Sequence, residues 1–156
     1  MQNIKTILIP TDFSKNSDLA LQKSIEYAVT CDATLHLTYV MPDTPNIFKL
    51  SKYMEKGRQQ ILNELEKSCE IYFEKQISKF QDFKDVKIKT HVLNGIPFKE
   101  ILRYEKKLKP DLIVITAQGE SALEEVVFGG TANKVIRYSA SPVLLVKKPK
   151  YSKSGD

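Results

Sequence analysis

The chain has 156 residues, of which 42% are hydrophobic and 28% are charged, a composition typical of one ordinary globular domain. No apolar stretch approaches the roughly 18 residues of a membrane span, and the first residues lack a signal peptide's apolar run, so we expect a soluble, cytoplasmic protein without a membrane partner. The net charge of +5 comes largely from lysines of the C-terminal tail, and aromatic and basic residues do not interleave, so nucleic acid is not an expected partner.

Five short apolar segments suited to β-strands alternate with segments of helical periodicity. The expected strands are residues 4–10, 33–41, 86–93, 111–116 and 142–146. The expected helices follow Ser14 and then cover about residues 51–80, 97–108 and 132–139. The long helix begins either near Ser51 or after Gly57, and it lacks the sustained heptads of a coiled coil. The alternation predicts an α/β fold with a five-stranded parallel sheet and helices on both faces.

Apolar positions at helical spacing predict which faces of two helices are buried. In the first helix these positions are Leu21, Ile25, Ala28 and Val29. In the long helix they are Ile61, Leu65 and Tyr72, with Leu62, Cys69 and Phe73 adjoining them.

Cysteine and histidine form no obvious cluster in this sequence. Cys31 and Cys69 are interpreted as buried, reduced thiols, with a disulfide or a metal pair as the alternative. His36 and His91 each look isolated on a strand-like segment, so a metal centre or a catalytic triad has little to build on.

Strand hydropathy predicts the order of the sheet. Residues 86–93 alternate between apolar and polar types, as an edge strand does, whereas residues 4–10 and 111–116 are continuously apolar, as central strands are. This favours the flavodoxin-like order 3-2-1-4-5, whose ligands bind beyond the carboxyl ends of strands one and four. Those ends carry Pro10, Thr11 and Asp12 on one strand and residues 116–119 on the other.

Several motifs then occur in a specific order. ILIPTDFS at residues 7–14, LHLTYV at 35–40, NGIP at 94–97 and SPVLLV at 141–146 together resemble the universal stress protein family. The resemblance covers about residues 4–147 and implies a three-layer sandwich of the adenine nucleotide alpha hydrolase-like kind. It implies a universal stress protein domain over residues 1–147, followed by a basic, flexible tail at 148–156.

Nucleotide-binding members of that family carry Gly-x2-Gly-x9-Gly-Ser/Thr. Glycines let the backbone approach a ribose and a phosphate, and the last pair begins a helix whose free N–H groups hold anionic oxygens. Here Gly119 and Gly129 keep the central spacing, but Thr116 replaces the first glycine and Gly130 replaces the Ser/Thr, with Thr131 next. The resemblance implies that ATP or a related adenine nucleotide, with or without Mg, contacts Pro10, Thr11, Asp12, Val40, Thr116, Gly119, Gly129, Gly130 and Thr131.

The departures from the motif leave other interpretations open. Thr116 could crowd a ribose, and the acidic residues Glu120, Glu124 and Glu125 oppose a triphosphate. Gly129 and Gly130 could also serve only as a tight start to the last helix, and Asp12 only as a helix cap. The alternative is a degenerate member that acts through an unknown regulatory protein partner; a flavoprotein of similar topology is a third hypothesis. No nucleophile–base pair or Walker motif is present, so we do not expect an enzyme, although slow hydrolysis of a bound nucleotide stays open.

The last strand, which runs from Pro142 to Val146, predicts self-association. In the order 3-2-1-4-5 it lies at an edge, yet its residues are continuously apolar. We therefore expect a homodimer through antiparallel pairing of this strand with its copy, as the family resemblance also implies. The alternative is that the tail from Lys147 folds back over the edge.

Overall fold

Five parallel strands in the order β3-β2-β1-β4-β5 form the sheet of the computed structural model, which describes residues 3–42, 57–83, 85–117 and 129–148. The strands are β1 (Thr6–Thr11), β2 (Thr34–Pro42), β3 (Ile88–Gly95), β4 (Leu112–Thr116) and β5 (Val143–Val146). The helices are α1 (Lys15–Cys31), α3 (Arg58–Ile77), α4 (Pro97–Leu108) and α5 (Gly130–Tyr138), and a 3-10 turn, η1 (Ser78–Phe83), follows α3. The expected fold class and strand order are confirmed.

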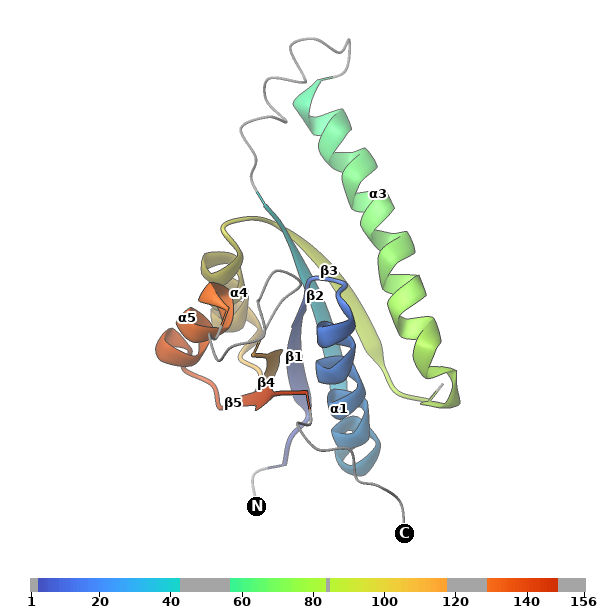
Figure 1. Ribbon diagram of the computed structural model, residues 1–156, viewed down its shortest axis with the longest axis vertical. Helices are drawn as coiled ribbons and strands as arrows, with labels where there is room; N and C mark the ends of the chain where they lie inside the picture. Colours follow the sequence, from blue (N-terminus) through green and yellow to red (C-terminus); the bar gives the residue numbers. More distant parts are fainter. Residues whose placement is uncertain (1–2, 43–56, 84, 118–128, 149–156) are drawn as a thin grey trace.

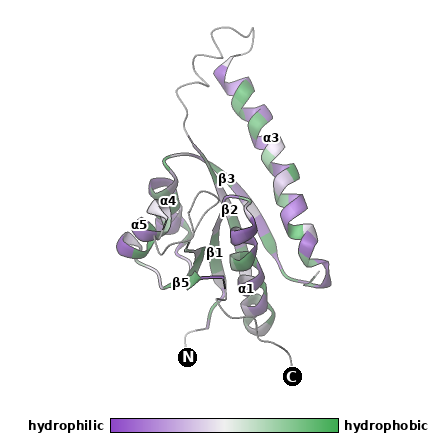
Figure 2. Ribbon diagram, viewed as in Figure 1, coloured by the Kyte–Doolittle hydropathy of each residue, from purple (hydrophilic) through white to green (hydrophobic). Residues whose placement is uncertain are grey.

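Helices cover both faces of the sheet (Figure 1). Since parallel crossovers are right-handed, the chain places α1 and α3 on one face as it moves from β1 to β3, and α4 and α5 on the other after it turns back. The side chains of β1 alternate accordingly: Ile7 and Ile9 pack into the α1 side, and Leu8 packs into the α4 side. Figure 2 shows hydrophobic and hydrophilic residues alternating along the helices, as expected for amphipathic helices that pack one face on the sheet and expose the other.

Several element bounds differ by one or two residues from those expected, and three starts or ends are informative. The helix α3 begins after Gly57, the later of the two predicted starts, and residues 43–56 lie outside the described residues. Asn94 and Gly95 lie beyond the expected end of the third strand at residue 93, but they are the last residues of β3, because β2 continues to Pro42 and offers them partners. Helix α5 begins at Gly130, two residues before the expected start.

The predicted buried faces are confirmed in large part, but Leu62 and Leu65 of α3 are only half-buried, and one predicted position in each helix is exposed. Leu21, Ile25 and Ala28 are buried, whereas Val29 is 59% exposed, so its assignment to the buried face of α1 was wrong. In α3, Tyr72 shares a side with the buried residue Ile61, yet it is 54% exposed because a cavity, and not the sheet, lies beside it.

Both cysteines are free: Cys69 is buried and Cys31 is half-buried. In the part of the chain that the structure describes, no helix has both the length and the apolar character that crossing a bilayer requires.

Candidate functional site

The turn between β1 and α1 places the first group of predicted site residues. Ser14 is the N-cap of α1, and its side chain accepts a hydrogen bond from the Ser17 N–H. Asp12 Oδ1 accepts the N–H of Ser14 at 3.0 Å, so Asp12 shapes the turn but is not the cap; the capping hypothesis for Asp12 was wrong. Phe13 between them has a φ of 62°, an uncommon conformation for a residue other than glycine.

The side chain of Thr11 points into the molecule. Its Oγ1 lies 3.0 Å from both Ser17 Oγ and Gln76 Oε1, and it accepts the N–H of Phe13. Gln76 in turn donates to Ser17 and to Asp18. The hydroxyl of Thr11 therefore joins the turn to α1 and α3, and its role is to hold the turn in place.

Beyond the carboxyl ends of β1 and β4 lies a cavity of about 520 Å³, which we call the switch-point cavity. Eight of the nine residues expected at a nucleotide site line it: Pro10, Thr11, Asp12, Val40, Thr116, Gly129, Gly130 and Thr131. The ninth, Gly119, lies outside the described residues, as do Glu120, Glu124 and Glu125. The fold thus gathers residues from four separate segments around one space.

The start of α5 borders this cavity. Gly129 is the N-cap, and its N–H donates to the carbonyl of Ala117 at 2.9 Å, which ties the helix to the end of β4. The N–H groups of the first helical turn have no intrahelical acceptor, and the helix dipole adds positive potential there. This end of the cavity can therefore hold an anionic group.

Gly129 and Gly130 are not explained by backbone strain. Gly129 has an ordinary φ of −51°, and a Cβ added to Gly130 would meet nothing within 4 Å. A serine would fit at position 130, so the structure does not require glycine at this position for a tight start of the helix.

Another part of the cavity lining is apolar. Val40, near the end of β2, is 6% exposed, and Ile101 of α4 and Ile115 of β4 are also buried there. Thr116, the last residue of β4, is half-buried beside them. The cavity therefore offers an apolar wall and an anion-binding helix start, an arrangement suited to a ligand with one apolar and one anionic part.

A family model described as the universal stress protein family matches residues 3–147. The chain belongs to the universal stress protein family. It is 36% identical over 146 residues to universal stress protein MJ0531 of Methanocaldococcus jannaschii, which covers 94% of this chain and 84% of that protein. It is 30% identical over 145 residues to universal stress protein YxiE of Bacillus subtilis, with 90% and 97% covered. The solved structure of protein MJ0577 superposes with a TM-score of 0.79 at 26% identity, covering 96% of this chain and 99% of that chain.

Sequence reasoning missed several residues of this universal stress protein's cavity, among them Tyr39, Pro97 and Ile101. Pro97 and Ile101 lie in the first turns of α4. The signal was available, because the order 3-2-1-4-5 with right-handed crossovers puts the start of that helix on the same face as α5.

The interpretation of the two histidines as isolated was wrong. His36 Nδ1 lies 3.0 Å from His91 Nε2 and 3.3 Å from the hydroxyl of Tyr104, beneath α4. Burial, together with His91 and Lys89, lowers the pKa of His36; burial, with Lys89 and Lys107, lowers the pKa of His91. Parallel pairing puts Thr38 opposite His91, so the sheet register brings the two imidazoles to one face. Among the described residues, no group of three or more His, Cys, Asp or Glu could hold a metal.

Proposed function

We propose that this universal stress protein is a regulatory module that binds ATP or another adenine nucleotide in the switch-point cavity. The observation that carries the proposal is the meeting of eight expected residues around one cavity bordered by the start of α5. The base packs against the apolar wall that contains Val40, and the phosphates lie at the first turn of α5, where Thr131 supplies a hydroxyl. In this arrangement Asp12 and Thr116, which also line the cavity, face the ribose.

Two solved universal stress proteins support the class of ligand. One is a complex with cAMP, with a TM-score of 0.66 and 18% identity, and another, from Archaeoglobus fulgidus, is a complex with dAMP, with a TM-score of 0.62 and 17% identity. At these identities they share the fold with this chain and no more. They show that this fold can hold an adenine nucleotide, which is the class that we propose here.

Isothermal titration of the purified chain with ATP, with and without Mg²⁺, and with AMP tests the proposal. We expect saturable binding that weakens several-fold in Thr131→Val, because the hydroxyl contact to phosphate is lost. The control is Thr30→Val, since Thr30 is an exposed threonine in the last turn of α1, whereas the cavity borders the first turn of that helix at Ser17. A folded sample that gives no heat with millimolar nucleotide would overturn the proposal.

A second candidate function is favoured by two features of the cavity. The side chain of Thr116 occupies its rim, and Gly130 leaves the first position of α5 without a hydroxyl. A degenerate module would have lost the nucleotide and would act through protein contacts alone. The double variant Thr116→Gly, Gly130→Ser separates the two candidates, and serine has room at position 130. If the variant binds ATP and the parent chain does not, the degenerate function holds; equal binding supports the nucleotide-binding module.

We also propose that the module forms a homodimer through β5. This strand lies at the edge of the sheet next to β4. The carbonyls of Pro142 and Val146 accept hydrogen bonds from β4 and from the residue after it. Successive residues of a strand direct their N–H and C=O groups to opposite sides, so those of Val143 and Leu145 face away from β4. Leu145→Pro removes an outward N–H without removing a bond to β4, and we expect it to convert the dimer to a monomer in analytical ultracentrifugation. A parent chain that is monomeric at tens of micromolar, or a variant that remains dimeric, would contradict this interface.

A further inference from the structure

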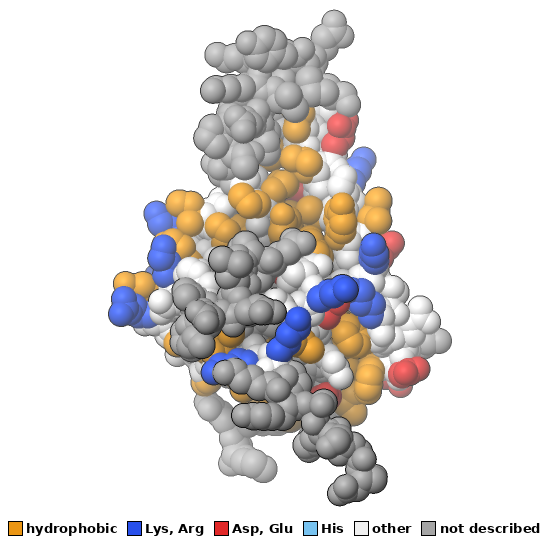
Figure 3. Space-filling model, viewed as in Figure 1, with side chains coloured by type: hydrophobic (Ala, Val, Ile, Leu, Met, Phe, Trp, Pro, Cys, Tyr) orange, Lys and Arg blue, Asp and Glu red, His pale blue; other side chains and the backbone are white. Residues whose placement is uncertain are grey.

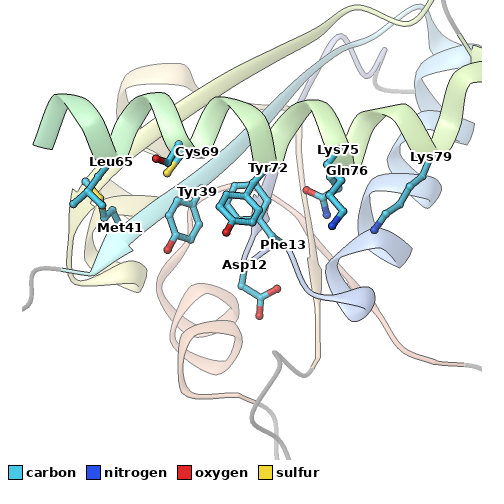
Figure 4. Close-up of a pocket in the computed structure, with 11 residues that line it drawn as sticks. Asp12, Phe13, Tyr39, Met41, Leu65, Cys69, Tyr72, Lys75, Gln76 and Lys79 are labelled. Atoms are coloured by element: carbon cyan, nitrogen blue, oxygen red, sulfur yellow. The ribbon is translucent and has the colours of Figure 1, made fainter. Parts of the chain in front are cut away.

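A second cavity, of about 490 Å³, lies between α3 and the carboxyl ends of β1 and β2. We call it the α3 cavity (Figure 4). The β1–α1 turn separates it from the switch-point cavity, and Asp12 and Tyr39 line both spaces. The α3 cavity explains why Tyr72, on the inner side of α3, is still 54% exposed.

The middle of the α3 cavity is aromatic. The ring of Phe13 lies 4.7 Å from that of Tyr39, 5.4 Å from that of Tyr72 and 5.0 Å from that of Phe73. Phe13 reaches this position through a backbone conformation that costs energy, and strain of this kind is concentrated at functional sites. The turn is held by hydrogen bonds from its N–H groups to Thr11 and Asp12.

The two ends of the α3 cavity differ in chemistry. Figure 4 shows the side chains along α3 in order, from Leu65 near Met41, through Cys69 and Tyr72, to Lys75 and Lys79. Met41 and Cys69 bring sulfur atoms to the first end, and sulfur makes favourable contacts with aromatic rings. The second end carries two lysines, of which Lys79 is already ion-paired with Asp18 at 2.6 Å.

Tyr39 and Cys69 of this cavity are uncharged at neutral pH. Burial, with smaller contributions from Cys69, Asp12 and Tyr72, raises the pKa of Tyr39; burial, with Glu66, raises the pKa of Cys69. A protonated thiol is a poor nucleophile, so the cavity is suited to binding and not to covalent chemistry. Its charged lining residues are Asp12, Lys75 and Lys79, an excess of one positive charge.

We propose that the α3 cavity is a second ligand site, which binds a small planar aromatic carboxylic acid. The ligand's ring lies against Tyr72 and Phe13, with its edge toward the sulfur-containing end, and its carboxylate faces Lys75. The volume is within the roughly 300–1,000 Å³ of small-molecule sites. On the face shown in Figure 3, hydrophobic side chains gather between α3 and α4, with both basic and acidic side chains beside them. The proposal does not rest on the proposed nucleotide, although Asp12 and Tyr39 line both cavities.

Titration of the isotopically labelled full chain with 2-naphthoate, followed by NMR, tests the site. We expect saturable shifts at the amides of Tyr39, Cys69 and Gln76. The neutral analogue 2-naphthylmethanol should bind several-fold more weakly because it lacks the charge, and decanoate should bind more weakly because it lacks the ring. Decanoate that binds as tightly as 2-naphthoate would overturn the aromatic specificity, and 2-naphthoate that causes no shifts at these amides would overturn the site.

Two exposed side chains allow substitutions that leave the fold intact. Tyr72→Ala should weaken 2-naphthoate binding roughly three- to tenfold, and Tyr138→Ala, an equally exposed aromatic of α5, should not change it. Lys75→Glu should weaken binding about fivefold and abolish the preference over 2-naphthylmethanol, whereas Lys67→Glu, on α3 but outside the cavity lining, should leave both unchanged. Binding that is insensitive to Tyr72→Ala and Lys75→Glu places the probe elsewhere and overturns the proposal.

Discussion

The two cavities of this molecule lie on either side of the same turn but are built in opposite ways. The switch-point cavity is formed by strand ends, glycines and the start of a helix, so its anion-binding character comes from backbone groups. The α3 cavity is formed by the side chains of Phe13, Tyr39 and Tyr72, with lysines at one end. One site depends on where the chain turns, and the other on how side chains pack.

This difference determines how each region should respond to substitution. A side-chain substitution leaves the backbone N–H groups in place, so the anion-binding character of the switch-point cavity should persist in variants such as Gly130→Ser. The α3 cavity should tolerate substitution less well, because its wall consists of aromatic side chains and each ring that is removed takes away part of that wall. Substitutions in the α3 side therefore provide the sharpest tests of the comparison.

Phe73→Ala should have the largest effect on stability. Phe73 is 2% exposed and packs against the ring of Phe13, so the variant loses buried apolar area and gains a void. We expect the free energy of unfolding to fall by about 3–5 kcal/mol, measured by urea denaturation. The exposed Phe83→Ala is the matched control and should change stability by less than about 0.5 kcal/mol. A loss below about 1 kcal/mol in Phe73→Ala would show that the aromatic cluster is not part of the core.

Gln76→Ala should lower the free energy of unfolding by less than Phe73→Ala does, and it should also loosen the β1–α1 turn between the two cavities. Gln76 is 2% exposed, and its removal deprives the Thr11 hydroxyl, Ser17 and Asp18 of a partner. We expect a loss of about 1–3 kcal/mol in urea denaturation, compared with almost none for Gln60→Ala on the exposed side of α3.

A double-mutant cycle with Thr11→Val tests whether the network acts as a unit. Residues that share a hydrogen-bond network are expected to show a coupling energy of about 0.5 kcal/mol or more. Additive effects of Gln76→Ala and Thr11→Val would contradict a direct link between α3 and the turn.

Much of the fold and of the switch-point cavity could be predicted from sequence. Strand hydropathy and crossover handedness predicted the order of the sheet, and apolar periodicity predicted the last helix to within two residues of its start at Gly130. These features are local in the chain, because periodicity and turn chemistry act over a few residues. The site residues themselves came from the family resemblance, and eight of the nine that it implied line one cavity.

The α3 cavity and the histidine pair could not be predicted in the same way. Helical spacing placed Tyr72 on the inner side of α3, but it does not specify how closely the helix approaches the sheet. Nor did it reveal that Gln76, a polar residue, would be buried through its bonds to Thr11 and Ser17. These features depend on contacts between residues distant in the sequence.

The pH dependence of stability should be the smallest effect, and it concerns the face that carries α4. The pKa values of His36 and His91 are lowered from their ordinary value of 6.5, mainly by burial. The groups that face the pair are Tyr104 of α4, with Lys89 on β3 and Lys107 on α4. The folded state therefore holds fewer protons than the unfolded state once the pH falls below about 6.5.

It follows that stability is fully present above about pH 6.5 and declines as the pH falls from there through the lowered folded pKa values. Urea midpoints at pH 7.5, 6.5 and 5.5 measure this decline. The chain has only two histidines, so His36→Gln with His91→Gln should nearly abolish the decline over this range. His91→Gln alone should reduce the decline without removing it, because burial, the main cause of the lowered pKa, still acts on His36. A parent chain whose stability is constant or rises toward pH 5.5 would contradict the buried, neutral histidine pair.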